Sequence, residues 1–217
     1  MYEKFLMNTP LFDGISVDEA KHILDCIGSH KKTFKKGETI FSAGSVINEM
    51  GLVLFGSVNI VVNFFWGESQ IFAHVESGDV FGENYAAIPN KELICDVTAA
   101  EDSEILFLNI QALLKTCERV CSFHHRIIQN MLCISAQKNL ALSTRMMHIA
   151  PKSIRSRLLS YLSEQAAEYG SSHFTIPFNR QQLAEYLSVN RSAMSNELSK
   201  MQKDGLIKYR KSEFILI

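Results

Sequence analysis

The sequence lacks the segments that would place the protein in or across a membrane. No apolar run approaches the roughly 18 residues that a membrane-spanning helix needs. The opening residues Met1, Tyr2, Glu3 and Lys4 do not form the pattern of a secretory signal peptide. The five cysteines are odd in number and scattered, which argues against a disulfide framework. We therefore expect a cytoplasmic protein with reduced thiols and no membrane contact.

The sequence also has few groups that could build a metal or catalytic centre. Residues 33–108 contain one histidine, His74, so a cupin-like metal site lacks its ligands. No nucleophile elbow and no phosphate-binding glycine loop is present. Cys117 and Cys121 would share a helix face and could bind metal or sense redox, but no third and fourth ligand lie nearby in the sequence. The prediction is a protein that is not an enzyme and has no catalytic residue, metal or cofactor.

The charges are unevenly distributed, although the formal net charge is only −1. Residues 151–217 contain 10 Lys and Arg against 6 Asp and Glu, whereas residues 1–150 contain 12 against 17. At 217 residues the chain is long enough for two small domains. A basic C-terminal domain beside an acidic body favours a sensor joined to a DNA-binding domain, because the positive potential is confined to the surface that would meet phosphate.

Two short helices joined by a turn are predicted between residues 178 and 207. Apolar residues recur at helical spacing over residues 180–187 and again over residues 192–203. The small Ala184 lets the helices cross closely, and Asn190 can cap the second helix by accepting a backbone N–H. This pattern is typical of a helix-turn-helix motif. The alternative is an ordinary pair of helices with a solvated face.

A β-hairpin is predicted after these helices, with strands at residues 206–209 and 214–217, and a further strand at residues 174–177 precedes them. Together these elements describe a winged helix. Asn196 suits adenine and Arg191 suits guanine or phosphate, while basic residues of the hairpin can meet the phosphate backbone. The predicted DNA contacts are Arg180, Asn190, Arg191, Ser192, Ser195, Asn196, Ser199, Lys208, Arg210 and Lys211.

Short β-strands separated by glycine turns dominate residues 33–108. Strands are expected at residues 39–41, 51–55, 57–65, 70–75, 80–81, 97–99 and 104–108. Many short strands without helices between them favour a small antiparallel roll or sandwich. Ahead of the roll, Ser16 and Glu19 have the spacing of a capping box and predict a helix that ends near residue 27.

A long helix is predicted from about residue 110 to residue 148, and Pro151 ends it. A helix of roughly 30 residues is too long for a roll of this size to cover, so we predict the seam of a parallel homodimer. The alternative is a helix that lies wholly on its own domain. The apolar stripe comprises Ile128, Met131, Ser135, Leu142 and Met146, flanked by Ile127, Ile134 and Ala141.

The order of these elements, and three sequence runs in particular, resemble the Crp/Fnr family of bacterial transcription regulators. Residues 34–44 read Phe-Lys-Lys-Gly-Glu-Thr-Ile-Phe-Ser-Ala-Gly, and residues 78–83 read Gly-Asp-Val-Phe-Gly-Glu. Residues 179–184 read Asn-Arg-Gln-Gln-Leu-Ala, and Ser188 replaces the glycine common at the turn that follows. The resemblance implies an α+β protein with an N-terminal antiparallel, cyclic-nucleotide-binding-like jelly roll, a dimerisation helix and a C-terminal winged helix-turn-helix. The expected limits are residues 1–115, 116–150 and 151–217.

The resemblance further implies three partners: double-stranded DNA with a palindromic promoter site, RNA polymerase and a second copy of the chain. It also implies a small-molecule effector held between the roll and the dimer helix. Members that bind cyclic AMP carry an Arg-Ser pair where this chain has Leu93 and Ile94, so the cyclic phosphate would lack its charge partner. Cyclic AMP is therefore not expected. We hypothesise that the effector is apolar or aromatic. The candidate effector-binding residues are Gly82, Glu83, Tyr85, Leu93, Ile94, Leu142 and Ser143, and Ile88 would help to bound the same site.

Two alternatives remain, and two sensing mechanisms of the family are not expected. These residues could simply fill the roll, which would make the protein a regulator without a ligand. The dimer helix could also serve a protein that does not bind DNA, although such a protein would not need the basic winged helix. The oxygen-sensing branch of the family uses an N-terminal cysteine cluster, and residues 1–30 offer only Cys26. Haem-sensing members use a histidine of the roll, for which His74 is the sole candidate.

Overall fold

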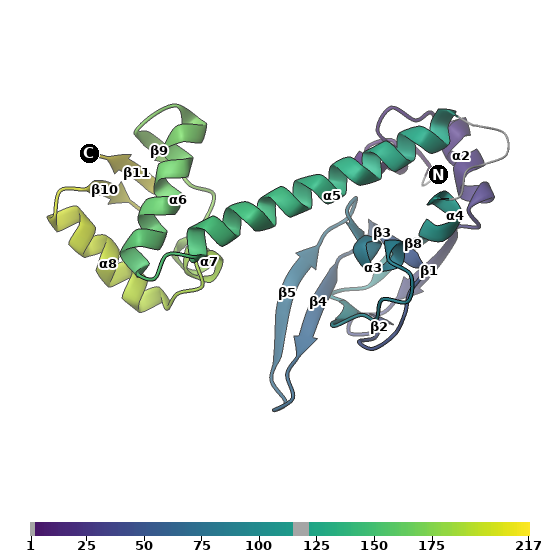
Figure 1. The fold of residues 1–217 in the computed structure, drawn as a ribbon, viewed down its shortest axis with the longest axis horizontal. Helices are drawn as coiled ribbons and strands as arrows, with labels where there is room; N and C mark the ends of the chain where they lie inside the picture. Colours follow the sequence, from purple (N-terminus) through teal and green to yellow (C-terminus); the bar gives the residue numbers. More distant parts are fainter. Residues whose placement is uncertain (1–2, 115–121) are drawn as a thin grey trace. The chain divides into compact units, whose positions relative to one another are not determined.

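The computed structural model describes residues 3–114 and 122–217 (Figure 1). The chain divides into two compact units, residues 1–136 and 137–217. The first contains a β-roll with short helices, the second contains a winged helix, and a long helix contributes residues to both. The predicted α+β fold class is therefore confirmed. Cys117 and Cys121 lie outside the described residues.

The roll consists of two four-stranded antiparallel sheets. One has the order β1 (His30–Phe34), β8 (Ser103–Asn109), β3 (Glu49–Phe55), β6 (Val80–Phe81). The other has the order β2 (Thr39–Phe41), β7 (Asp96–Ala99), β4 (Val58–Asn63), β5 (Ser69–Val75). The seven predicted strands are all present, and β1 is an additional strand that sequence patterning did not predict.

The middle of the first sheet is buried on both faces, because five consecutive residues of β3 are buried. One face contributes Val53, Ile105 and Phe107 to a core shared with the second sheet. The other face contributes Leu52, Leu106 and Leu108 to a core closed by helices. Those helices are α1 (Glu3–Leu6), η1 (Pro10–Phe12), α2 (Val17–Cys26), α3 (Glu83–Ala87) and α4 (Ile110–Leu114). The predicted capping box of Ser16 and Glu19 begins α2.

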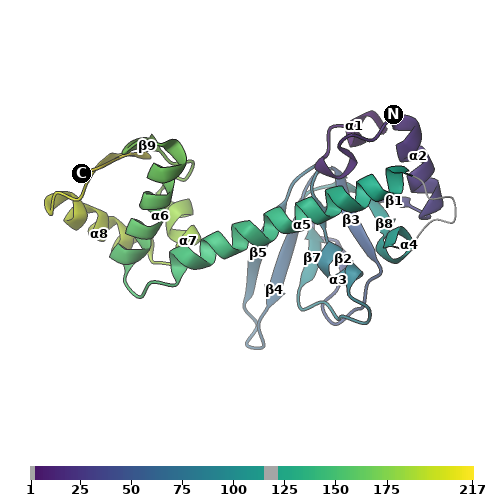
Figure 2. The ribbon, with the colours of Figure 1, turned by 45° about the horizontal axis from the view of Figure 1, so that its top comes forward.

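The β4–β5 hairpin extends beyond the rest of the roll (Figures 1 and 2). Aromatic side chains gather at its tip, where Phe65 and Trp66 are exposed and the Trp66 ring stacks on Phe64 with centroids 5.9 Å apart. Ile71 and Phe72 on β5 are also exposed. The hairpin therefore carries apolar surface that the roll itself does not cover.

The apolar side chains in the first half of the long helix α5 (Ser122–Ile149) pack on the roll of their own chain. Ile127 is fully buried, and Ile128, Met131 and Ile134 pack against the same core as α1 and α2. This corrects the predicted dimer stripe, whose first half lies on the roll of its own chain. Exposed apolar residues of α5 lie on two sides: Leu142 and Met146 belong to the second half of the predicted stripe, and Leu132, Ala136, Leu140 and Met147 lie on the opposite face.

The second unit has the elements of a winged helix in the expected order. They are α6 (Ile154–Tyr169), β9 (His173–Thr175), α7 (Arg180–Tyr186), α8 (Arg191–Lys203), β10 (Ile207–Arg210) and β11 (Glu213–Leu216). The three strands form an antiparallel sheet of order β10-β11-β9. A single apolar core, which includes Leu162, Leu183, Leu198 and Phe214, joins this sheet to the three helices.

Candidate nucleic-acid interface

The two helices of the predicted DNA-binding motif are both capped by asparagine. Asn179 accepts the backbone N–H groups of Gln181 and Gln182, and the Gln182 side chain returns the contact, which completes a capping box at α7. Asn190 caps α8 by accepting the backbone N–H groups of Ser192 and Ala193 at 2.9 and 3.1 Å. The carboxamide oxygen of Asn190 is thus engaged within the protein, which leaves its NH₂ group to meet a ligand.

The outer face of α8 presents small polar groups to solvent. Arg191, Ser192, Asn196 and Ser199 are exposed, and Ser195 is half-buried. The hydroxyls of Ser195 and Ser199 donate to the carbonyls of Arg191 and Ser195, four residues earlier, at 2.9 and 3.1 Å. The Ser195 oxygen is therefore left as an acceptor, whereas the Ser199 oxygen also lies 3.4 Å from the Tyr209 hydroxyl. This face is narrow and polar enough to approach base edges in a major groove.

The turn between α7 and α8 contains Ser188 in the left-handed region, with φ of +53°. Side chains with a Cβ are strained there, whereas glycine is not. Arg157 of α6 holds this turn, because its Nη1 donates to the carbonyls of Leu187 and Ser188 at 3.0 Å each. Ser188 thus occupies a strained position, and an arginine of a neighbouring helix stabilises the turn.

Replacing Ser188 by glycine is expected to raise the free energy of unfolding of the winged helix by about 0.5 kcal/mol. Relief of the left-handed strain contributes about 1 kcal/mol, and the greater freedom of glycine in the unfolded chain offsets part of it. Urea unfolding followed by far-ultraviolet circular dichroism measures the change. Ser199→Gly, inside α8, is the matched control and should lower stability. A loss of stability in Ser188→Gly would show that the Ser188 side chain contributes more than its backbone strain costs.

Arg180, a predicted DNA contact, lies between α7 and the hairpin. Its guanidinium is 4.8 Å from the Tyr209 ring centroid and 5.3 Å from that of Phe214. Burial lowers the pKa of Arg180, and the neighbouring Tyr209 opposes this effect. The side chain therefore ties α7 to the wing, and any contact it makes with DNA comes from the part that remains exposed.

Three of the predicted cationic residues surround one hollow of about 560 Å³. It opens where the first turns of α7 and α8 meet the β10–β11 turn, and its charged members are Arg180, Arg191 and Lys211. Gln181, which sequence reasoning did not single out, lines the same hollow. Its position in the first turn of the first helix of the motif could have marked Gln181 as a candidate DNA contact. The arrangement converges positive charge and donors on the surface beside α8.

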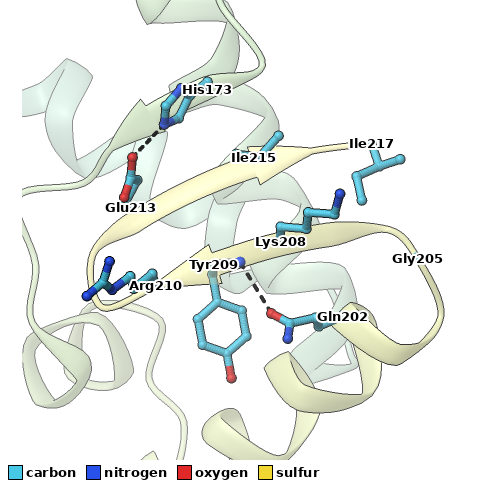
Figure 3. Close-up of a pocket in the computed structure, with 9 residues that line it drawn as sticks. All are labelled: His173, Gln202, Gly205, Lys208, Tyr209, Arg210, Glu213, Ile215 and Ile217. Carbon is cyan, nitrogen blue, oxygen red and sulfur yellow. Dashed lines mark hydrogen bonds and ion pairs between the residues drawn. The ribbon is translucent and has the colours of Figure 1, made fainter.

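Lys208 and Arg210 lie elsewhere. Alternation along β10 points both side chains to the face opposite Tyr209, as Figure 3 shows. They line a second hollow of about 510 Å³, together with Ile217 and an ion pair in which His173 Nε2 lies 2.6 Å from Glu213 Oε1. The Tyr209 hydroxyl instead lies 3.4 Å from the Ser199 hydroxyl of α8, and its backbone N–H donates to Gln202, which also lines this hollow. The sequence list of DNA contacts is therefore divided between two surfaces of the wing.

The α8 helix is also fixed by an ionic contact with α6. Arg155 Nε lies 2.5 Å from Glu197 Oε1, and its Nη1 lies 2.7 Å from Asp204 Oδ2. The hydrogen bond to Glu197, followed by that to Asp204, raises the pKa of Arg155. The three residues tie α8 to α6 at the edge of their apolar contact.

The predicted effector residues of the roll do not form a uniform lining. Glu83 and Leu93 are buried, and Tyr85 is half-buried against the helix-covered core. Ile94 is 72% exposed. Gly82 has φ of +76°, and a Cβ at this position would lie 3.1 Å from Ile47, so its glycine is a requirement of the backbone. Burial raises the pKa values of Tyr85 and Cys95, which keeps both in their protonated forms at neutral pH.

The remaining effector positions, Leu142 and Ser143, are exposed on α5. His74, the candidate haem ligand, is exposed and its Nδ1 lies 2.7 Å from Asn59 Oδ1. No group of three metal-ligating side chains is found within residues 3–114 and 122–217. Over the same ranges, no helix combines the length and the hydropathy needed to span a bilayer.

A capped helix-turn-helix with a basic wing, preceded by a two-sheet roll, defines a DNA-binding regulator with a cyclic-nucleotide-binding-like domain. Family models agree: one described as the cyclic nucleotide-binding domain matches residues 31–120, and one described as the Crp-like helix-turn-helix domain matches residues 156–217. Together they cover more than half of the sequence. The chain belongs to the Crp/Fnr family of transcription regulators.

Individual relatives are distant but match over most of their length. Electron transport regulator A of Shewanella oneidensis is 24% identical over 208 residues, 89% of this chain and 77% of the relative. The probable transcriptional regulator flp of Lacticaseibacillus casei is 26% identical over 200 residues, 91% of this chain and 87% of the relative. The solved structure of OCPA-complexed CprK is 14% identical, covers 92% of this chain and 91% of its own, and gives a TM-score of 0.63. At this identity the structural likeness bears on the fold alone.

Proposed function

We propose that this regulator acts as a homodimer that reads a palindromic promoter site, with one α8 helix in the major groove of each half-site. The observation that carries the proposal is the convergence of Arg180, Arg191 and Lys211 beside the exposed polar face of α8. In this arrangement Asn196 and Ser192 read base edges, and Lys211 meets the phosphate backbone. Arg191, at the first turn of α8, contributes to either group.

The proposed dimer uses the exposed apolar face of α5. Leu132 and Leu140 are each 68% exposed, and Met147 is 62% exposed, although all three are apolar and lie on one side of the helix. A second copy of the same helix would cover them in a parallel seam. A domain division at about residues 115 and 150, with α5 as the dimerisation segment between roll and winged helix, is part of this proposal. Activity on promoter DNA implies a cytoplasmic protein.

The proposed effector is an apolar or aromatic small molecule rather than cyclic AMP, because Leu93 and Ile94 supply no charge partner for a phosphate. Of the solved structures with this fold, CprK is complexed with OCPA and CLP of Xanthomonas campestris is responsive to c-di-GMP, so ligand chemistry varies on this fold. A regulator of the same fold that needs no ligand is the alternative. Contact with RNA polymerase is proposed from family membership alone.

DNA binding by the purified, reduced protein tests the proposal. We expect selection from random and genomic fragments to recover one palindromic site, and affinity for it to fall steeply as salt rises. Lys211→Ala should reduce the slope of log affinity against log salt by about two units, because one phosphate contact is lost in each of the two protomers. Lys203→Ala, at the other end of α8, should change the slope less. A protein that binds no DNA even at low salt would contradict the proposed function.

A further inference from the structure

One buried imidazole joins three helices where α5 ends. His148 lies in the last turn of α5 and is 2% exposed. Its Nε2 is 2.8 Å from Glu164 Oε2 on α6, and its Nδ1 is 2.9 Å from the hydroxyl of Tyr186, the last residue of α7. The ring also packs edge-on against Tyr161 of α6, with centroids 5.4 Å apart. All of these residues belong to the second compact unit.

The partners define the hydrogen bonds of this contact. Burial, reinforced by the charge of Glu164 and opposed by that of Arg145, raises the pKa of Tyr186, so the residue is a phenol at neutral pH. Burial likewise raises the pKa of Tyr161. Nδ1 and Nε2 of His148 thus each have a polar partner, the Tyr186 hydroxyl and the Glu164 carboxylate, so both ring nitrogens are satisfied.

An arginine adds further contacts at the C-terminal end of α7, beside His148. Arg145 of α5 donates from Nε to the Tyr186 carbonyl at 3.1 Å and from Nη2 to the Glu185 carbonyl at 3.2 Å. Its guanidinium lies 5.6 Å from the Tyr186 ring centroid. The last carbonyls of a helix have no partner within the helix, and positive charge is favourable there. Side chains from α5 therefore both cap α7 and fix it in place.

We propose that His148 is a positioning residue for DNA reading. Through its contacts with Tyr186 and Glu164, it fixes the direction of α7 and α8 relative to α5. The inference rests on the proposed homodimer, in which α5 is the shared helix. Since α8 packs on α7, a rotation of α7 about the end of α5 moves α8 with it. The contacts of His148 with Tyr186 and Glu164 therefore determine how strictly the dimer requires its two half-sites to be one turn of DNA, roughly 34 Å, apart.

The test compares two variants that each remove one hydroxyl. Tyr186→Phe breaks the contact with His148, whereas Tyr169→Phe removes a hydroxyl that donates to the Thr175 carbonyl at 3.0 Å in the same winged helix but away from α5. Both are measured on the site that the wild-type protein selects and on the same site with one or two base pairs inserted or deleted between the half-sites. The ratio of the two affinities is the spacing selectivity.

We expect Tyr186→Phe to lower the spacing selectivity by about tenfold, the equivalent of one hydrogen bond, and Tyr169→Phe to leave it at the wild-type value. Affinity of Tyr186→Phe for an isolated half-site should be unchanged, because the DNA-contacting groups are intact. His148→Leu should behave like Tyr186→Phe. His148→Gln, which keeps a donor and an acceptor, should restore part of the selectivity.

Circular dichroism confirms that each variant is folded before DNA is added. If Tyr186→Phe and His148→Leu lowered thermal stability but kept the wild-type spacing selectivity, the contact would serve folding alone and the inference would be wrong. An equal loss of selectivity in Tyr169→Phe would overturn it as well. The wild-type protein in the same assay tests the proposed function separately, because a failure to select any palindromic site lies with the dimer model and not with His148.

Discussion

Replacing Leu140 on α5 by glutamate is expected to convert the protein to a monomer and to lower its affinity for a palindromic site by about 100-fold or more. In a symmetric parallel seam each copy faces its own equivalent, so the substitution places two carboxylates opposite each other in apolar surroundings. A monomer then binds each half-site separately and loses the gain of linked binding, which is typically 10²- to 10⁴-fold. Sedimentation velocity measures the first effect and fluorescence anisotropy the second.

The control for this experiment lies one residue further along the helix. Ala141 is exposed, but it is rotated by about 100° from Leu140 and lies outside the exposed apolar face. Ala141→Glu adds the same charge to the same helix and should leave the protein dimeric. If Leu140→Glu remained a dimer with unchanged DNA affinity, α5 could not be the seam, and another surface would have to bring two winged helices together.

Arg191→Ala is expected to weaken binding of the dimer to the selected operator by about 30-fold or more, because each half-site loses a bidentate contact worth about 1–3 kcal/mol. The residue begins α8, is exposed, and lines the basic hollow shared with Lys211. Its substitution removes one charge-assisted donor at the point where the recognition helix meets DNA. Fluorescence anisotropy with operator DNA and with random DNA of equal length measures the loss.

The two DNA sequences separate the two possible roles of Arg191. A base contact requires a larger loss on operator than on random DNA, whereas a phosphate contact weakens both about equally. Lys203→Ala removes the same charge from the far end of α8 and should have a smaller effect on both. Equal losses in Arg191→Ala and Lys203→Ala would mean that general charge, and not the position of Arg191, determines the affinity.

Sequence patterning predicted the elements whose residues act locally. The strands of the roll, the α2 capping box and the Asn190 cap depend on alternation, turn residues or a partner two or three positions away. Strand β1 was not predicted because four of its five residues are exposed, so neither alternation nor an apolar run marks it. It is recognisable only through its pairing with β8, about 70 residues further along the chain.

The same limit explains the error on α5. Apolar residues at helical spacing identify a buried face but not the partner that buries it, so Ile127, Ile128, Met131 and Ile134 were assigned to a second copy although they pack on their own roll. The roles of Arg180, Arg145 and His148 were likewise inaccessible to the sequence. Each depends on aromatic rings or carbonyls that lie far away in the chain. The exposed residues of α8 could be predicted from the sequence, because they all lie on one helix and follow its periodicity.

The exposed tip of the β4–β5 hairpin has a practical consequence for spectroscopy. Trp66 is the one tryptophan of the chain, and it stacks on Phe64 in a position open to water. Its emission will report on the local environment of this tip and will be nearly silent when the winged helix unfolds. A blue shift on addition of a small molecule, of DNA or at higher protein concentration would therefore identify the condition under which the hairpin becomes covered.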